Sequence, residues 1–179
     1  LVHGYIRAAR EMVEISTGRA LITQSWRMSL DGWPPLAGGA WWDGIRQGAM
    51  AQGAARFVEI PKPPLRSIEL IALFNDADQQ TVWAAANYFA DTAAAPGRVV
   101  LRNTASAPSA LRAASGLQIS FTCGYGDGPS DVPAALRQAV LMLSAHFYEH
   151  REVVAGAGGA GRMPMGVGAL LGPYRLARL

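Results

Sequence analysis

The chain has 179 residues and a mass of 19.0 kDa, the size of one domain or of one domain with an appendage. Its 16 Lys and Arg residues, all arginine except Lys62, exceed its 13 Asp and Glu residues by three and are scattered, which argues against a free nucleic-acid-binding module. The single cysteine, Cys123, excludes a disulfide framework and a cysteine-based zinc site, and no run approaches the roughly 20 apolar residues of a membrane span.

The first predicted element is an amphipathic helix over residues 1–17. Apolar residues recur there at three- and four-residue steps, with Arg and Glu on the other side. No charged and then apolar leader opens the chain, so we expect no signal peptide. Gly18 supplies a helix stop. Alternation then replaces helical periodicity, with Trp26, Met28 and Leu30 on one face, which predicts a half-buried strand.

The middle of the chain, residues 20–123, is predicted to be a β region. Within it, residues 37–55 carry many glycines around Trp41 and Trp42 without a sustained period, which favours a long glycine-rich loop. Paired aromatic residues in such a loop could anchor a partner, and a local cluster under the loop explains them equally well. Further strands are predicted at residues 57–60, 67–74, 81–88, 98–102 and 117–122.

The last third predicts a long helix, a linker and a short terminal segment. A capping side chain ahead of Pro133 begins a helix over residues 132–154 that is apolar on more than one side. Residues 155–166 are glycine-rich and favour a flexible linker, and residues 167–179 favour a short amphipathic turn. We therefore expect an α+β fold in which amphipathic helices bracket a small antiparallel β region, followed by a flexible C-terminal tail.

One stretch of the sequence matches a catalytic pattern. His146, Glu149 and His150 match the H-x-x-E-H arrangement of inverted zinc peptidases, in which two histidines one helical turn apart share a metal. A catalytic zinc also needs a third protein ligand. The only carboxylate after His150 is Glu152, on a different part of the helix, and His3 has no recognisable spacing. A zinc-dependent hydrolase is therefore the alternative, and a helix end with polar and aromatic residues is the favoured interpretation.

Several stretches together resemble one family, the head-tail connector (adaptor) proteins of tailed phages in the phiE125 gp8-like group, with relatives in prophages and gene transfer agents. Their order and spacing cover most of the chain. The matching stretches are residues 6–27 (IRAAREMVEISTGRALITQSWR), 31–34 (DGWP), 60–65 (IPKPPL), 123–126 (CGYG), 132–139, 147–152 (FYEHRE) and 170–175 (LLGPYR). Members of this family carry an aromatic-Tyr-Glu-x-Arg-Glu helix end for structural reasons, which accounts for the zinc-like pattern.

The resemblance implies a structural protein without enzymatic activity, cofactor or metal. It implies an adaptor domain over residues 1–154 and a dodecameric ring in the neck of a virion or gene transfer agent particle, assembled in the host cytoplasm. The implied partners are the portal protein, a stopper or tail-terminator protein, other copies of the chain, and double-stranded DNA that passes through the ring without sequence-specific binding. A ring of this kind requires two different complementary surfaces on each subunit.

Candidate contact residues follow from this resemblance. We expect a docking segment to attach to the portal and to be dispensable for folding, and Trp41 and Trp42 to face a neighbouring subunit or tail component. The docking residues are Met163, Met165, Leu170, Leu171, Tyr174 and Arg175. The family usually has a further helical segment ahead of the first helix here, and residues 37–55 resemble an insertion.

Overall fold

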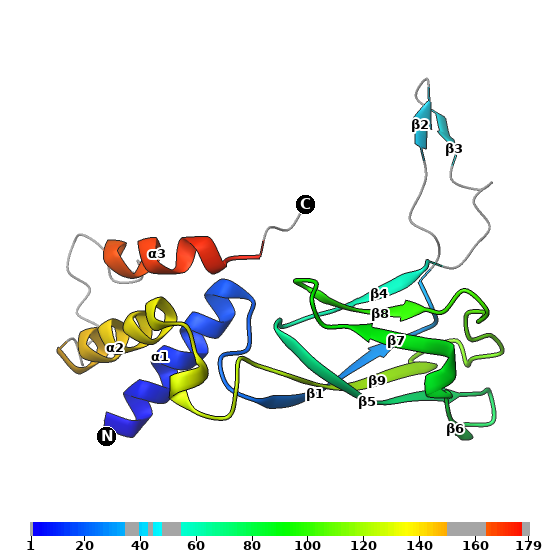
Figure 1. Ribbon diagram of the computed structural model, residues 1–179, viewed down its shortest axis with the longest axis horizontal. Coiled ribbons are helices and arrows are strands. Elements are labelled where there is room, and N and C mark those ends of the chain that lie inside the picture. Colours follow the sequence, from blue (N-terminus) through cyan, green and yellow to red (C-terminus); the bar gives the residue numbers. More distant parts are fainter. Residues whose placement is uncertain (1, 35–39, 43–44, 48–54, 150–163, 177–179) are drawn as a thin grey trace. The chain divides into compact units, whose positions relative to one another are not determined.

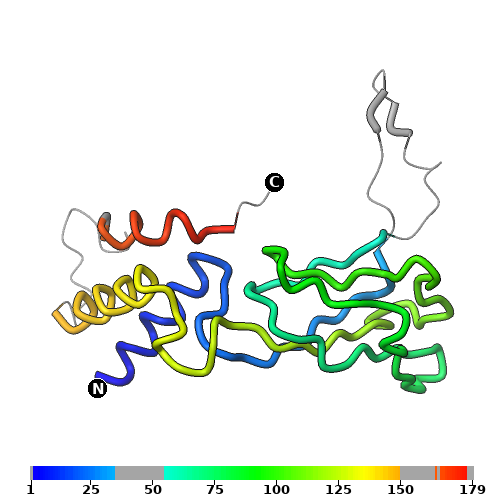
Figure 2. The backbone as a smooth tube through the Cα atoms, viewed as in Figure 1, coloured from blue at the N-terminus to red at the C-terminus, as the bar shows by residue number. Residues whose placement is uncertain are grey.

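The computed structural model describes residues 2–34, 40–42, 45–47, 55–149 and 164–176. The chain divides into two compact units. The helical unit combines residues 1–24 with residues 124–179, and the β unit is the continuous segment 25–123 (Figure 2). Helices occur together with antiparallel sheets, so the α+β prediction is confirmed. None of the described helices is both long and apolar enough to cross a membrane.

Three helices build the helical unit (Figure 1): α1 (Val2–Thr17), α2 (Ala134–Glu149) and α3 (Met165–Leu171). Two short 3-10 helices, η2 (Pro129–Asp131) and η3 (Gly172–Tyr174), accompany them. The helix predicted over residues 1–17 is confirmed. The helix predicted over residues 132–154 begins two residues later than expected, and its predicted end lies outside the described residues. Apolar side chains from all three helices form one core: Ala9, Val13, Leu21, Val132, Leu136, Ala139, Leu143, Val167 and Leu171.

A buried carboxylate joins α1 to the chain that follows it. The Glu14 side chain is 8% exposed, and its Oε1 accepts hydrogen bonds from the Leu21 backbone N–H (2.9 Å) and from Gln24 Nε2 (2.6 Å). The Thr17 hydroxyl donates to the Val13 carbonyl oxygen at 2.8 Å. Buried polar groups of this kind are costly unless they are hydrogen-bonded. These bonds therefore fix the direction in which the chain leaves α1.

The β unit contains two main sheets. The first has the strand order β1 (Gln24–Leu30), β9 (Leu117–Cys123), β5 (Leu65–Phe74), β6 (Gln80–Val82), and the second has the order β4 (Phe57–Ile60), β8 (Gly97–Leu101), β7 (Tyr88–Asp91). The strands predicted at residues 57–60, 67–74, 98–102 and 117–122 are confirmed with small shifts of their ends. All the pairings β4–β8, β7–β8, β5–β9 and β5–β6 are antiparallel.

The core of the β unit follows from the two-residue period of its strands. Leu117, Ile119, Phe121 and Cys123 in β9 are all buried and alternate with half-buried polar residues. The second sheet packs against this side: a Cβ added at Gly97 in β8 would come within 2.7 Å of the Leu65 side chain in β5. Two antiparallel sheets with buried inner faces make this unit a small sandwich (Figure 1).

The structure differs from the sequence prediction over residues 81–88, where one strand was expected. Strand β6 ends at Val82, and the Trp83 indole turns inward, 8% exposed, 5.3 Å from the Trp33 ring centroid and 5.4 Å from that of Tyr88. The 3-10 helix η1 (Ala85–Asn87) follows before β7 begins. Burial of the indole thus breaks the strand in two. The edge-to-face and stacked geometries are favourable arrangements for aromatic pairs.

The predicted loop at residues 37–55 lies mostly outside the described residues. Its described part forms an antiparallel pair of short strands, β2 (Ala40–Trp42) and β3 (Ile45–Gln47). A hairpin therefore occupies part of the segment in which the sequence favoured an irregular loop. Glycine-rich composition obscured the pairing.

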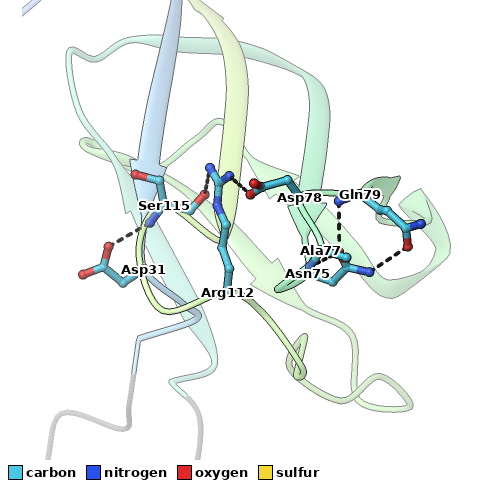
Figure 3. A network of polar contacts seen from close by, with 7 residues as sticks. All are labelled: Asp31, Asn75, Ala77, Asp78, Gln79, Arg112 and Ser115. Carbon is cyan, nitrogen blue, oxygen red and sulfur yellow. Dashed lines mark hydrogen bonds and ion pairs between the residues drawn. The ribbon is translucent and has the colours of Figure 1, made fainter.

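A polar network ties together the loops at one end of the β unit (Figure 3). Arg112 donates to Asp78 Oδ1 at 2.7 Å and to the Ser115 carbonyl oxygen at 3.2 Å, and its guanidinium carbon lies 4.7 Å from the Phe74 ring centroid. The Ser115 backbone N–H donates to Asp31 Oδ1 at 3.0 Å. The segment that joins β8 to β9 is thereby attached to the turns that follow β1 and β5.

Candidate interaction surfaces

The predicted docking segment is part of the helical core. Val167 and Leu171 are fully buried against α1 and α2, Leu170 and Tyr174 are partly buried, and Arg175 is exposed. Met165 is the first residue of α3. Met163 lies outside the described residues. The expectation that this segment is dispensable for folding is therefore wrong, since deleting it would remove two fully buried side chains from the helical core.

The end of the segment is held by the turn after α1. Arg19 Nε donates to the Tyr174 carbonyl oxygen at 2.7 Å, and the Leu176 backbone N–H donates to the Thr17 carbonyl oxygen at 3.3 Å. Burial raises the pKa of the Tyr125 phenol, and the Arg19 guanidinium beside it opposes that rise. Gly18 has a φ of 72°, and a Cβ there would lie 3.1 Å from Leu176. Glycine at this position thus permits both the helix stop and the close approach of the terminal segment.

Trp41 and Trp42, the second predicted contact, lie in strand β2. In its pairing with β3, Trp41 is opposite Arg46 and Trp42 is opposite Ile45.

The alternative of a zinc site gains no support from the geometry. His146 lies on α2 with its ring 6.2 Å from that of Phe147, and Glu149 is the last residue of the helix. His150 lies outside the described residues. Across the described ranges, no three His, Cys, Asp or Glu side chains lie close enough together to hold a metal ion.

A pocket on the β unit contains a carboxylate, Glu69, but its environment does not favour catalysis. It is lined by Ser25, Trp26, Arg27, Glu69, Ser120 and Phe121. Glu69 accepts hydrogen bonds from the Ser67 hydroxyl (2.5 Å) and the Thr122 hydroxyl (3.0 Å), which hold the pKa of its carboxyl below the usual range. A carboxyl with a lowered pKa is a weaker general base than an ordinary one. The hydrogen bonds suit a structural role on the sheet.

The outer face of the β4–β8–β7 sheet carries an exposed cluster that sequence analysis missed. Phe57 and Phe89 are 39% and 44% exposed and lie opposite the same residue, Val100, on either side of it. The guanidinium carbon of Arg98 lies 5.0 Å from the Phe57 ring centroid, and that of Arg102 lies 5.8 Å from the Phe89 centroid. We call these five residues the sheet patch. Neither residues 57–60 (FVEI) nor residues 98–102 (RVVLR) alternate apolar with polar side chains, so only the strand register reveals this cluster.

Charge on the sheet patch is partly balanced within the sheet. Arg98 donates to Asp91 Oδ2 through Nε (3.1 Å) and Nη2 (2.5 Å), and this pairing holds the pKa of the Asp91 carboxyl below its usual range. Arg102 has no carboxylate partner among the described residues. Within the described residues, the patch therefore combines exposed aromatic rings with an arginine, Arg102, that is in no ion pair. Aromatic residues and arginine are the types enriched at protein–protein interfaces.

No protein-family model and no curated protein matches the chain. Among solved structures, it is similar to a chain in the neck of an empty gene transfer agent (GTA) particle, computed with C6 symmetry. The two are 29% identical with a TM-score of 0.72, over 99% of this chain and 78% of that one. A chain in the neck of the native GTA particle, computed with C12 symmetry, is 28% identical with a TM-score of 0.71, over 99% and 83% of the two chains.

A chain in the virion of the native GTA particle is 26% identical with a TM-score of 0.73, over 99% of this chain and 78% of that one. The likeness thus spans both units of the chain and includes its sequence as well as its fold. These neighbours are structural components of a particle. The prediction that the chain is a structural protein and not an enzyme is therefore confirmed, whereas membership of the phiE125 gp8-like group stays a prediction.

Proposed function

We propose that this chain is a structural component of the neck of a phage-like particle, of the gene transfer agent type. The observation that carries the proposal is the match over 99% of the chain to neck chains at up to 29% identity. The C6 and C12 symmetries of those necks support a finer proposal, a ring of identical copies that acts as an adaptor. In that role the ring lies between the portal and a stopper or tail-terminator protein, and the particle assembles in the host cytoplasm.

Double-stranded DNA would pass through the ring. A formal net charge of +3, spread along the chain, suits a channel through which DNA must slide, because each phosphate contact adds affinity and would slow the movement. No sequence-specific DNA contact is part of the proposal.

The portal contact is proposed to involve the surface of the C-terminal segment. Arg175 is exposed and Tyr174 and Leu170 are partly exposed, so these side chains are available to a partner while Leu171 holds the segment in the helical core. Tyrosine and arginine are common energetic anchors at interfaces. Trp41 and Trp42 remain proposed contacts to a neighbouring subunit or tail component.

The test is quantitative mass spectrometry of DNA-filled particles from the source organism, purified on a density gradient. We expect the chain to be present at a fixed ratio near one copy per portal subunit. Its absence from intact tailed particles would contradict the proposed function. Particles from a strain with an Arg175→Ala chain should contain fewer copies if the portal contact is as proposed, and a Gln79→Ala strain, altered at an exposed turn of the β unit, is the matched control.

A further inference from the structure

Helix α2 presents apolar residues on a second side, away from its core. Leu136, Ala139 and Leu143 face α1 and α3, whereas Leu141, Ala145 and Tyr148 are exposed, Leu141 by 60% and Tyr148 by 49%. Steps of four and then three residues place the exposed three on one side of a helix. We call them the α2 stripe. The sequence indicated that this helix is packed from more than one side. Within the described chain, the Tyr148 ring lies edge-to-face with that of Tyr5 on α1, at 6.4 Å between centroids, while Leu141 and Ala145 are exposed.

The sheet patch and the α2 stripe are two different surfaces of similar composition. Each has exposed large apolar or aromatic side chains in a row, and each ends in a charged residue. At the sheet patch the charge is Arg102, and at the α2 stripe it is Glu149, which is exposed one residue after Tyr148. No ion pair engages Glu149 within the described residues. The two surfaces are therefore complementary in charge.

We propose that the sheet patch of one copy packs against the α2 stripe of the next copy, so that Arg102 of one meets Glu149 of the other. This inference rests on the proposed function, because a ring of identical copies needs a heterologous contact between two different surfaces of the chain. Apolar rows would supply the buried centre of the contact, and the charged pair would fix its register. Two separate surfaces on one chain generate a head-to-tail series, which closes into a ring when the rotation between successive copies divides a full turn.

The contact is tested by mixing two variants of the full chain. Phe57→Ser with Phe89→Ser removes the sheet patch, and Leu141→Gln with Tyr148→Gln removes the α2 stripe while keeping good helix formers. Analytical ultracentrifugation should show that the wild-type chain forms oligomers with rising concentration, whereas each variant alone stays monomeric. Loss of an anchor pair should weaken association at least about thirtyfold.

The mixture of the two variants is the decisive sample. Each variant retains the surface that the other lacks, so an equimolar mixture should form a one-to-one dimer that does not grow further. Formation of this dimer also proves that both variants are folded. A self-complementary contact is distinguished by the wild-type chain, which would then stop at a dimer instead of growing with concentration. Absence of the dimer, or a wild-type chain that stays monomeric at the highest attainable concentration, would overturn the inference.

Matched controls are available in both units. Val82 in the β unit is 63% exposed and Ile15 on α1 is 80% exposed, and neither belongs to the proposed contact. Val82→Ser and Ile15→Ser should leave the association unchanged. If either control abolishes it as completely as the patch variants do, the contact does not lie where we propose.

Charge reversal gives a second, independent readout. Arg102→Glu should weaken association because it places two carboxylates together, and adding Glu149→Arg should restore it. Failure of this rescue would contradict the charged pair. The mixing experiment and the mass spectrometry of particles test different claims. If the chain is found in particles but its variants give no dimer on mixing, only this contact is overturned. If the chain is absent from particles, the proposed function is overturned.

Discussion

The two units are built from the chain in different ways. The β unit is one continuous segment, residues 25–123, within which β1 and β5 both pair with the distant strand β9, whereas the helical unit joins residues 1–24 to residues 124–179. Closing a long intervening segment has an entropic cost that must be met before the helical core gains its contacts. The helical unit therefore depends on the rest of the chain for its assembly, while the β unit holds all its own partners.

Among the substitutions that separate the two units, Phe121→Ala is expected to cause the largest loss of stability. Phe121 is the largest fully buried side chain of the described residues and lies in β9. Truncation of such a phenylalanine costs about 3–5 kcal/mol. Hydrogen exchange should show lost protection across residues 55–123, with α1 and α2 retaining theirs if the units are energetically separate. Equal loss in both units would show that they unfold as one.

Leu171→Ala makes the converse change in the helical unit. Leu171 is fully buried in the core that α1, α2 and α3 share, so we expect a loss of about 2–5 kcal/mol, measured by chemical denaturation. Leu141→Ala on the exposed side of α2 is the control and should change the stability of the monomer by less than about 0.5 kcal/mol. A neutral Leu171→Ala would mean that α3 is not part of the folded core in solution.

Gly97→Ala tests how closely the two sheets of the β unit approach. Because the added methyl would lie 2.7 Å from Leu65 Cδ2, we expect destabilisation of about 1–3 kcal/mol through overpacking. Gly4→Ala on α1 meets nothing within 4 Å and should instead stabilise its helix, by about 0.5–1 kcal/mol. Thermal unfolding of both variants measures the contrast. Equal melting temperatures would contradict the sheet packing.

The smallest effect concerns the Arg98–Asp91 pair on the outer face of the β unit. Because Arg98 lowers the pKa of the Asp91 carboxyl in the folded chain, its stabilisation is present above the pKa of the unfolded chain and is lost as pH falls through the lowered value. Asp91→Asn should reduce the denaturation midpoint slightly at neutral pH and not at all in acid. Asp76→Asn, at an exposed turn, is the control, and a pH-independent difference for Asp91→Asn would contradict the charge argument.

Sequence patterns predicted local elements well where one face of a helix or strand is buried in the same unit. The alternation of β9 and the period of α1 both reflect such burial, so α1 and the strands near residues 57–60, 67–74, 98–102 and 117–122 were found. The inward turn of Trp83 was not predicted because it depends on contact with Trp33, which lies 50 residues away in the sequence. The sheet patch was not predicted because the sequence of a single strand does not determine its register with its neighbours. That register places Phe57 and Phe89 beside Val100.

The chain leaves the helical unit and returns to it at almost the same point. Ile22 forms a parallel bridge with Gly126, and the Thr23 backbone N–H donates to the Gly126 carbonyl oxygen at 2.8 Å. Gly124, with a φ of 124°, makes the close crossing possible, since a Cβ there would lie 2.8 Å from the Thr23 nitrogen. Residues 25–123 are thus an insertion between two segments of the helical unit, residues 22–23 and Gly126, whose backbones are hydrogen-bonded to each other. A foreign domain with neighbouring termini could be grafted at this junction, and the three-helix core would keep its own connections.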